Sequence, residues 1–152
     1  MEVAFFTWEH HGRRQVGWEA VRGKRTRIPG TVMAAQKGLP HDLLQYVVEA
    51  ACGFQDGFWG LVARGATFRS TDRRATRPGR ALIAAHRADL ARAEALAGLH
   101  QRAWAVGQRS AVTEALDRAR ASWEELRPGE HLVFTWPSAS GSPRSGLLAG
   151  RR

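Results

Sequence analysis

Strand-like segments lie at the two ends of this chain, and the long stretch between them shows helical patterns. Residues 2–9 and 131–136 are rich in β-branched and aromatic types, and residues 15–23 alternate again after a turn that contains Gly12. A stable sheet needs about three strands that share an apolar face. We therefore expect the first and last strands to be neighbours, and the first strand, apolar on both faces, to be covered on both.

Four segments between these strands have the composition and punctuation of α-helices. Pro40 precedes the first, at about 41–52, and Asp56 is placed to cap a shorter second helix. Residues 80–106 are rich in alanine and free of proline, which predicts one long helix, and Ser110 is placed to cap a fourth. The prediction is an α+β domain: a small antiparallel sheet, formed by an N-terminal hairpin and a C-terminal strand, packed on about four helices.

Length and composition indicate one globular domain. The chain has 152 residues, 43% of them hydrophobic, and its single cysteine, Cys52, excludes internal disulfides and Cys-rich zinc motifs. We see neither a run of ~20 apolar residues nor a secretory signal, so we expect a cytoplasmic protein without membrane contact. Residues 1–136 form the predicted domain, and residues 137–152 are predicted to be a disordered basic tail. We expect no cofactor, because no cofactor motif is recognisable.

The positive charge of the chain is concentrated in two internal segments. Its 23 basic residues exceed its 14 acidic residues, which gives a net charge of +9, and residues 10–30 and 64–80 carry +5 each. By contrast, the arginines of residues 81–136 are balanced by acidic residues. A GC-rich genome can raise the arginine content without selection for binding, but it would spread the excess more evenly. Two basic loops in one small domain are able to form a patch that attracts polyanions, and the sequence leaves open whether they lie on the same side of the sheet.

The main functional hypothesis from the sequence is a non-enzymatic binding module for an anionic partner such as nucleic acid. Trp18 precedes a basic loop, and single-stranded nucleic-acid binders stack bases on aromatic rings while cations contact phosphates. Packing of Trp18 in the core is the alternative. The candidate anion-binding residues are Arg13, Arg14, Trp18, Arg22, Lys24, Arg25, Arg27, Arg69, Arg73, Arg74 and Arg77.

A second hypothesis is a small enzyme, with or without a metal, built on the helix at 41–52. His41, Gln45 and Glu49 recur every four residues and are expected to share its exposed polar face. Metalloproteases place two histidines at this spacing as zinc ligands, but here Gln45 takes the second position, and an amide is a poor zinc ligand. The alternative is a helix with a polar outer face and an acid, Asp42, near its N-terminus. His41 and Glu49 are candidate metal ligands in this hypothesis alone.

The same helix carries a resemblance to other proteins. Residues 39–49 read Leu-Pro-His-Asp-Leu-Leu-Gln-Tyr-Val-Val-Glu, and residues 57–60 read Gly-Phe-Trp-Gly. Over about residues 39–69 the chain resembles a group of small uncharacterised proteins from GC-rich actinobacteria, in which a Leu-Pro-His-Asp helix precedes a Gly-Phe-aromatic-Gly segment. That group has a histidine where this chain has Gln45, and the resemblance implies no activity.

A third hypothesis is a protein-interaction adaptor that docks a partner through the helix at 80–106 or the tail. Ile83, Leu90, Ala97 and Trp104 recur every seven residues there and predict a narrow packing seam. His86 and His100 lie on the same seam, about 21 Å apart along a helix, so they are expected to pack rather than to share a metal.

Four of the six tryptophans fit core positions by their pattern: Trp8, Trp104, Trp123 and Trp136. Trp18 and Trp59 are harder to place.

Overall fold

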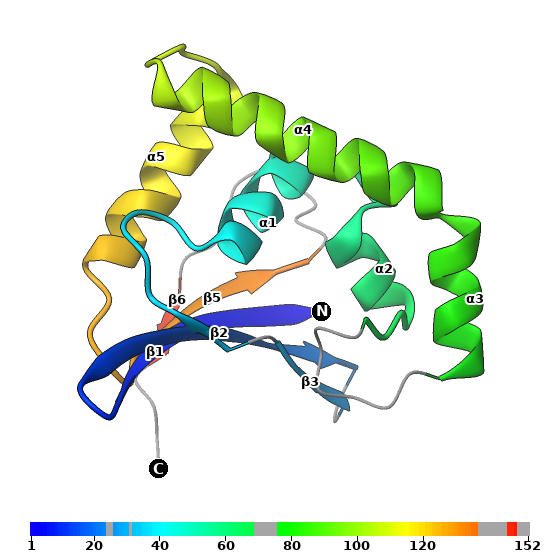
Figure 1. The fold of residues 1–152 in the computed structure, drawn as a ribbon, viewed down its shortest axis with the longest axis horizontal. Coiled ribbons are helices and arrows are strands. Elements are labelled where there is room, and N and C mark those ends of the chain that lie inside the picture. Colours follow the sequence, from blue (N-terminus) through cyan, green and yellow to red (C-terminus); the bar gives the residue numbers. More distant parts are fainter. Residues whose placement is uncertain (24–25, 31, 69–75, 137–145, 149–152) are drawn as a thin grey trace.

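The described part of the chain forms an antiparallel sheet of six strands with five helices on one of its faces (Figure 1). The computed structural model describes residues 1–23, 26–30, 32–68, 76–136 and 146–148, the last three by their backbone only. The strands are β1 Glu2–His10, β2 Arg13–Arg22, β3 Thr26–Pro29, β4 Met33–Ala34, β5 His131–Thr135 and β6 Gly146–Leu148. Their order is β3-β2-β1-β5-β6, and β4 also pairs with β2.

The first and last predicted strands are neighbours, as the sequence indicates. In the antiparallel pairing of β1 with β5, Val3 lies opposite Phe134 and Phe5 lies opposite Leu132. The N-terminal amine of Met1 also donates a hydrogen bond to the carbonyl oxygen of Trp136 at 2.6 Å. The predicted α+β class is therefore confirmed, and the sheet joins segments that are about 130 residues apart in the chain.

The helices form one layer above the sheet (Figure 1). They are α1 His41–Ala51, α2 Phe58–Arg64, α3 Arg77–Ala85, α4 Arg87–Ala105 and α5 Ala111–Glu124. The long helix predicted at 80–106 is two helices, because the backbone leaves helical geometry at His86, with φ −111° and ψ 23°. Neither glycine nor proline stands at this break, so the residue pattern carries no signal for it.

Aromatic rings fill the space between the sheet and the first two helices. Trp59 of α2 is fully buried, and its ring contacts those of Phe5, Tyr46 and Trp18 with centroids 5.6, 5.3 and 4.7 Å away. The indole N–H of Trp59 has no hydrogen-bond partner among the described residues, so this side chain is held by packing alone. Burial of several large rings in edge-on contact is a main source of stability for this domain.

The tryptophans that were hardest to place from sequence are the ones at the centre of this core. Trp18 and Trp59 are buried, and the predicted burial of Trp123 and Trp136 is confirmed. Trp8 and Trp104, also predicted to be buried, are only half-buried.

The opposite face of the sheet is not covered by any of the described helices. Phe6 and Trp8 of β1, with His131 and Val133 of β5, point to this outer face and are half-buried. Val3, Phe5 and Thr7 point to the inner face and are buried. The expectation that both faces of the first strand are covered is therefore wrong for the described structure, and an aromatic row lies on the outside.

Three short strands, β3, β4 and β6, lie where the residue patterns predict no strand. β3 extends the hairpin beyond the predicted loop, and Ala20 of β2 lies opposite Ile28. Within the predicted tail, residues 146–148 instead form β6, which pairs with β5; the rest of 137–152 lies outside the described residues.

Of the described helices, none combines the length and the apolar character needed to cross a bilayer.

The predicted cap of α5 is confirmed and gives a test of local stability. Ser110 Oγ accepts from the backbone N–H of Thr113 at 3.2 Å, and the backbone N–H of Ser110 donates to Thr113 Oγ1 at 2.8 Å. Ser110→Ala should lower the free energy of unfolding by about 1 kcal/mol, measured by urea denaturation. Ser122→Ala, inside the same helix, is the control and should change it by less than about 0.5 kcal/mol. Equal effects of the two substitutions would contradict the capping role.

Candidate functional site

Two basic segments that are far apart in the sequence meet at one end of the molecule. Arg22, the last residue of β2, donates from Nη1 to the carbonyl oxygen of Val62 in α2 at 3.1 Å. A Cβ atom built on Gly65 would lie 3.2 Å from the same nitrogen. Thr67 Oγ1 in turn accepts a hydrogen bond from the backbone N–H of Thr76 at 3.2 Å. The β2–β3 turn, the end of α2 and the start of α3 are thereby brought together.

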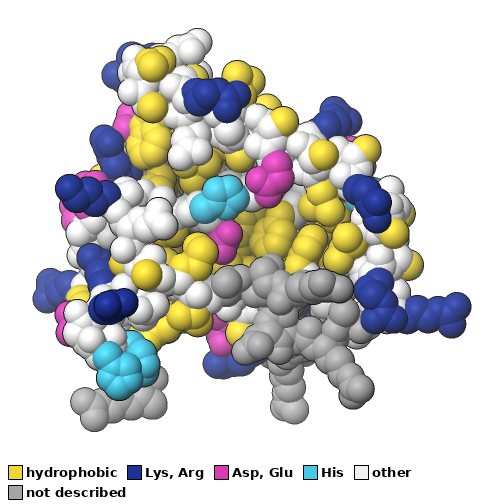
Figure 2. All heavy atoms as spheres, in the orientation of Figure 1, with side chains coloured by type: hydrophobic (Ala, Val, Ile, Leu, Met, Phe, Trp, Pro, Cys, Tyr) yellow, Lys and Arg dark blue, Asp and Glu magenta, His cyan; other side chains and the backbone are white. Residues whose placement is uncertain are grey.

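We call this region the basic end and define it by five described arginines. They are Arg22, Arg27, Arg64, Arg77 and Arg80. Arg27 is 74% exposed and lies 3.4 Å from Glu19, whereas Arg64 lies 2.7 Å from Asp56. Arg77 and Arg80 are exposed in the first turn of α3. Basic side chains occupy the rim of the face in Figure 2, including the corner at α3, while its centre holds hydrophobic side chains together with a histidine and acidic side chains.

Several candidate residues fall outside the described part of the chain. The sequence positions immediately adjoining the basic end hold these five basic residues: Lys24, Arg25, Arg69, Arg73 and Arg74. The argument below therefore rests on the described arginines alone.

Arg13 and Arg14 do not belong to the basic end. They begin β2 and Arg22 ends it, so the ten residues of the strand separate them by about 30 Å. Arg14 donates from Nη2 to the carbonyl oxygen of Leu126 at 3.2 Å and to Thr7 Oγ1 at 3.4 Å. Arg14 thus ties the sheet to the end of α5, which is a structural role. The segment 13–27, named as one basic loop from the sequence, is mostly strand, so Arg13 and Arg14 are separated from its other basic residues.

Trp18 is a core residue. Its side chain is only 3% exposed, and its indole Nε1 donates to Asp42 Oδ2 in α1 at 2.8 Å. A Cβ atom on Gly30 would collide with the indole ring, so the chain passes directly against it. A base cannot stack on a ring enclosed in this way. The stacking hypothesis for Trp18 is corrected, and its alternative, packing in the core, holds.

The prediction that His41, Gln45 and Glu49 share an exposed face of α1 is wrong for Gln45 and Glu49, whereas His41 is exposed. Gln45 is 3% exposed and Glu49 is fully buried. The carboxylate of Glu49 accepts hydrogen bonds from the backbone N–H groups of Phe58 and Trp59, both at 3.0 Å, and from Gln45 Nε2 at 2.9 Å. Glu49 therefore caps α2 from a different helix, in place of the predicted cap Asp56.

Burial raises the pKa of Glu49 to about 7, and Glu94 adds a smaller contribution in the same direction. The hydrogen bonds from Gln45 and from the α2 backbone oppose this shift but do not cancel it. A carboxyl group with such a pKa is a potential acid or base. Here, however, both oxygens of Glu49 accept hydrogen bonds from donors inside the core. Protonation of Glu49 therefore affects the stability of the fold and not a bound substrate.

His41 and Glu49, the candidate metal ligands of the second hypothesis, do not meet. They are eight residues apart on α1, which is about 12 Å along the helix axis. His41 is half-exposed, with Nδ1 3.6 Å from Asp42 and Nε2 3.7 Å from Glu94. Its hydrogen bond to Asp42 raises its pKa, while partial burial opposes the rise and Glu94 assists it. His41 is thus part of a surface ion-pair group.

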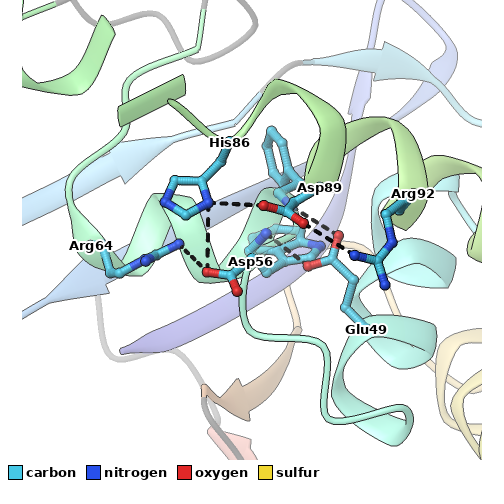
Figure 3. A network of polar contacts seen from close by, with 8 residues as sticks. Glu49, Asp56, Arg64, His86, Asp89 and Arg92 are labelled. Atoms are coloured by element: carbon cyan, nitrogen blue, oxygen red, sulfur yellow. Dashed lines mark hydrogen bonds and ion pairs between the residues drawn. The ribbon is translucent and has the colours of Figure 1, made fainter. Parts of the chain in front are cut away.

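A different group, which the sequence analysis missed, has the composition of a metal site (Figure 3). His86 Nδ1 lies 3.1 Å from Asp89 and 3.8 Å from Asp56. Each carboxylate also faces an arginine, Arg64 at 2.7 Å from Asp56 and Arg92 at 3.5 Å from Asp89. A divalent cation would have to displace or repel both guanidinium groups. The arrangement is better explained as an ion-pair network that ties α2 to the break between α3 and α4.

Cys52 is an unpromising nucleophile despite a neighbouring histidine. Its Sγ lies 3.7 Å from Nε2 of His100, but partial burial raises the pKa of the thiol. The residue also stands at the C-terminal end of α1, where the helix dipole disfavours a thiolate. The contact is therefore consistent with packing between α1 and α4.

Comparison of the chain with protein-family models, curated proteins and solved structures finds no match in any of the three. A functional conclusion therefore has to be argued from the geometry and charge of this chain itself.

The raised pKa of Glu49 predicts how stability depends on pH. The pKa rises from 4.5 in a model compound to about 7 in the fold, so the stability linked to protonation is fully present below pH 4.5 and is lost as pH rises through 7. Between pH 5 and 8 the free energy of unfolding of the wild type should fall by up to about 3 kcal/mol more than that of Glu49→Gln, because each unit of pKa difference between the folded and unfolded states corresponds to ~1.4 kcal/mol. His41 is present in both proteins and cancels in this difference. Urea unfolding at both pH values measures it, and parallel pH profiles would contradict the assignment.

Proposed function

We propose that this protein is a binding module for a polyanion, and specifically for nucleic acid, with the basic end as its main contact. The observation that carries the proposal is the convergence of two basic segments, near residues 22–27 and 64–80, on one end of the fold. A charge excess produced by genomic composition alone would have no reason to converge in this way. Nucleic acid is favoured because its regularly spaced phosphates reward several arginines at once.

Four of the five described arginines of the basic end divide into two kinds. Arg22 and Arg64 are engaged with the fold, at the carbonyl oxygen of Val62 and at Asp56. Arg27 and Arg77 are exposed and project their charge to solvent, although Arg27 lies near Glu19. The exposed pair is therefore the better choice for mutation, because replacing Arg22 would also remove a bond that holds α2 to the sheet.

The double substitution Arg27→Gln/Arg77→Gln should weaken binding to every nucleic-acid sequence. If both residues contact phosphates of a single strand, the slope of log Kd against log salt should fall by about 1.4, since each contact contributes ~0.7. Fluorescence anisotropy with a labelled oligonucleotide between 50 and 200 mM salt measures it. The matched control is Arg102→Gln/Arg118→Gln, which removes the same charge from α4 and α5.

Equal loss of affinity in both double variants would assign the effect to net charge and would contradict a local site. An unchanged slope in the Arg27/Arg77 variant would show that the basic end does not contact phosphates. Circular dichroism and urea unfolding of both variants exclude loss of folding as the cause.

A further inference from the structure

The outer face of the sheet carries a row of aromatic rings that the fold does not need for its core. Phe6 of β1 lies directly opposite His131 of β5, with ring centroids 5.0 Å apart. Phe6 also contacts Trp8, two residues further along the same strand, at 5.6 Å. All three side chains are half-buried, and none of the described helices covers them.

The ring of Trp8 lies against Gly17 of the neighbouring strand β2. A Cβ atom on Gly17 would lie 3.2 Å from the Trp8 ring and 3.6 Å from the Phe6 ring. Because Gly17 has no side chain, both rings have room over this position of β2. We call Phe6, Trp8 and His131 the aromatic platform.

Arginines stand on the same face at both ends of β2. Arg13 lies opposite His10, next to Trp8, and Arg27 of β3 lies opposite Val21, at the basic end. The register places both on the side of the sheet that holds the aromatic platform, with about 26 Å of β2 between them. Glu2 and Glu19 share this face, and Glu19 lies 3.4 Å from Arg27.

This combination matches the needs of single-stranded nucleic acid better than those of other partners. Every base has a π face that can stack on an aromatic ring, and cations beside the rings contact the phosphates between bases. The bases of a duplex are stacked on each other and cannot use such a surface. The face is continuous with the basic end through Arg27, so one strand can contact both.

We infer that the outer face of the sheet is a base-stacking platform, in which Phe6, Trp8 and His131 bind unpaired bases of a single-stranded nucleic acid. This inference rests on the proposed function for its phosphate contacts and adds the class of ligand. The base stacking that the sequence predicted for Trp18 is assigned here to Phe6, Trp8 and His131.

The direct test uses the unmodified full chain and two probes with the same number of phosphates. One is a 15-residue oligothymidylate, and the other is an abasic oligomer of equal length. The native oligomer should bind at least fivefold more tightly for each stacked base, because stacking on one ring contributes roughly fivefold to 100-fold in affinity. The salt slopes of the two probes should be similar, since their charges are equal.

Two protein variants assign the preference to the platform. Phe6→Leu and Trp8→Leu keep an apolar side chain over β2 and should each reduce oligothymidylate affinity roughly fivefold or more while leaving abasic affinity unchanged. Trp104→Leu, at a half-buried tryptophan of α4 outside the platform, is the control and should retain the preference. A variant that fails to fold leaves the comparison of the two probes on the wild type as the deciding measurement.

The outcomes separate this inference from the proposed function. Equal affinity of both probes, with a salt slope that falls in the Arg27/Arg77 variant, overturns the platform and leaves polyanion binding standing. Absence of binding to either probe at low salt overturns both. Self-association of the wild type that Trp8→Leu abolishes, without an effect on oligothymidylate, assigns the face to a second copy of the chain and overturns the platform.

Discussion

The arrangement of this domain depends on the hydrogen bonds that the carboxylate of Glu49 accepts from the start of α2. The N-cap residue of α2 is Gly57, which has no side chain with which to cap the helix, and the two free N–H groups of Phe58 and Trp59 are satisfied by Glu49 of α1. A Cβ on Gly57 would approach the carboxylate to 2.5–2.6 Å, so glycine is required there. This contact fixes α2 against α1.

The position of α2 then determines both the core and the basic end. Trp59, in the first turn of α2, enters the aromatic cluster on the sheet, and Val62, one turn later, presents the carbonyl oxygen that receives Arg22. Without these contacts the end of α2 would not adjoin the β2–β3 turn. The buried carboxyl group thus links the stability of the fold to the place where two basic segments meet.

Much of the fold could be predicted from local sequence patterns, and the errors have physical reasons. The hairpin, the closing strand at 131–136 and the Ser110 cap follow from residue types at regular spacing. The polar spacing of Gln45 and Glu49 indicated an exposed face, because periodicity cannot tell a solvated polar face from one satisfied by another helix. The His86 break and the two-residue strand β4 depend on tertiary contacts that no short pattern encodes.

The candidate site shows the same limit more sharply. The charge sums predicted that basic residues gather, but they could not show that β2 holds Arg13 and Arg22 at opposite ends. Alternation along a strand tells which residues share a face and not which face is inside. Trp18 lies opposite Phe5 on the inner face, whereas Trp8 lies opposite Gln15 on the outer one. The half-buried outer ring is therefore Trp8, which the sequence pattern placed in the core.

The most direct test of the account is an NMR titration of the isotope-labelled full chain with oligothymidylate at low salt. The account predicts shifts that are concentrated at the amides of Phe6, Trp8 and His131, at the indole N–H of Trp8, and around Arg27 and Arg77. Shifts confined to the outer surfaces of α4 and α5, or a spectrum that does not change at all, would contradict it.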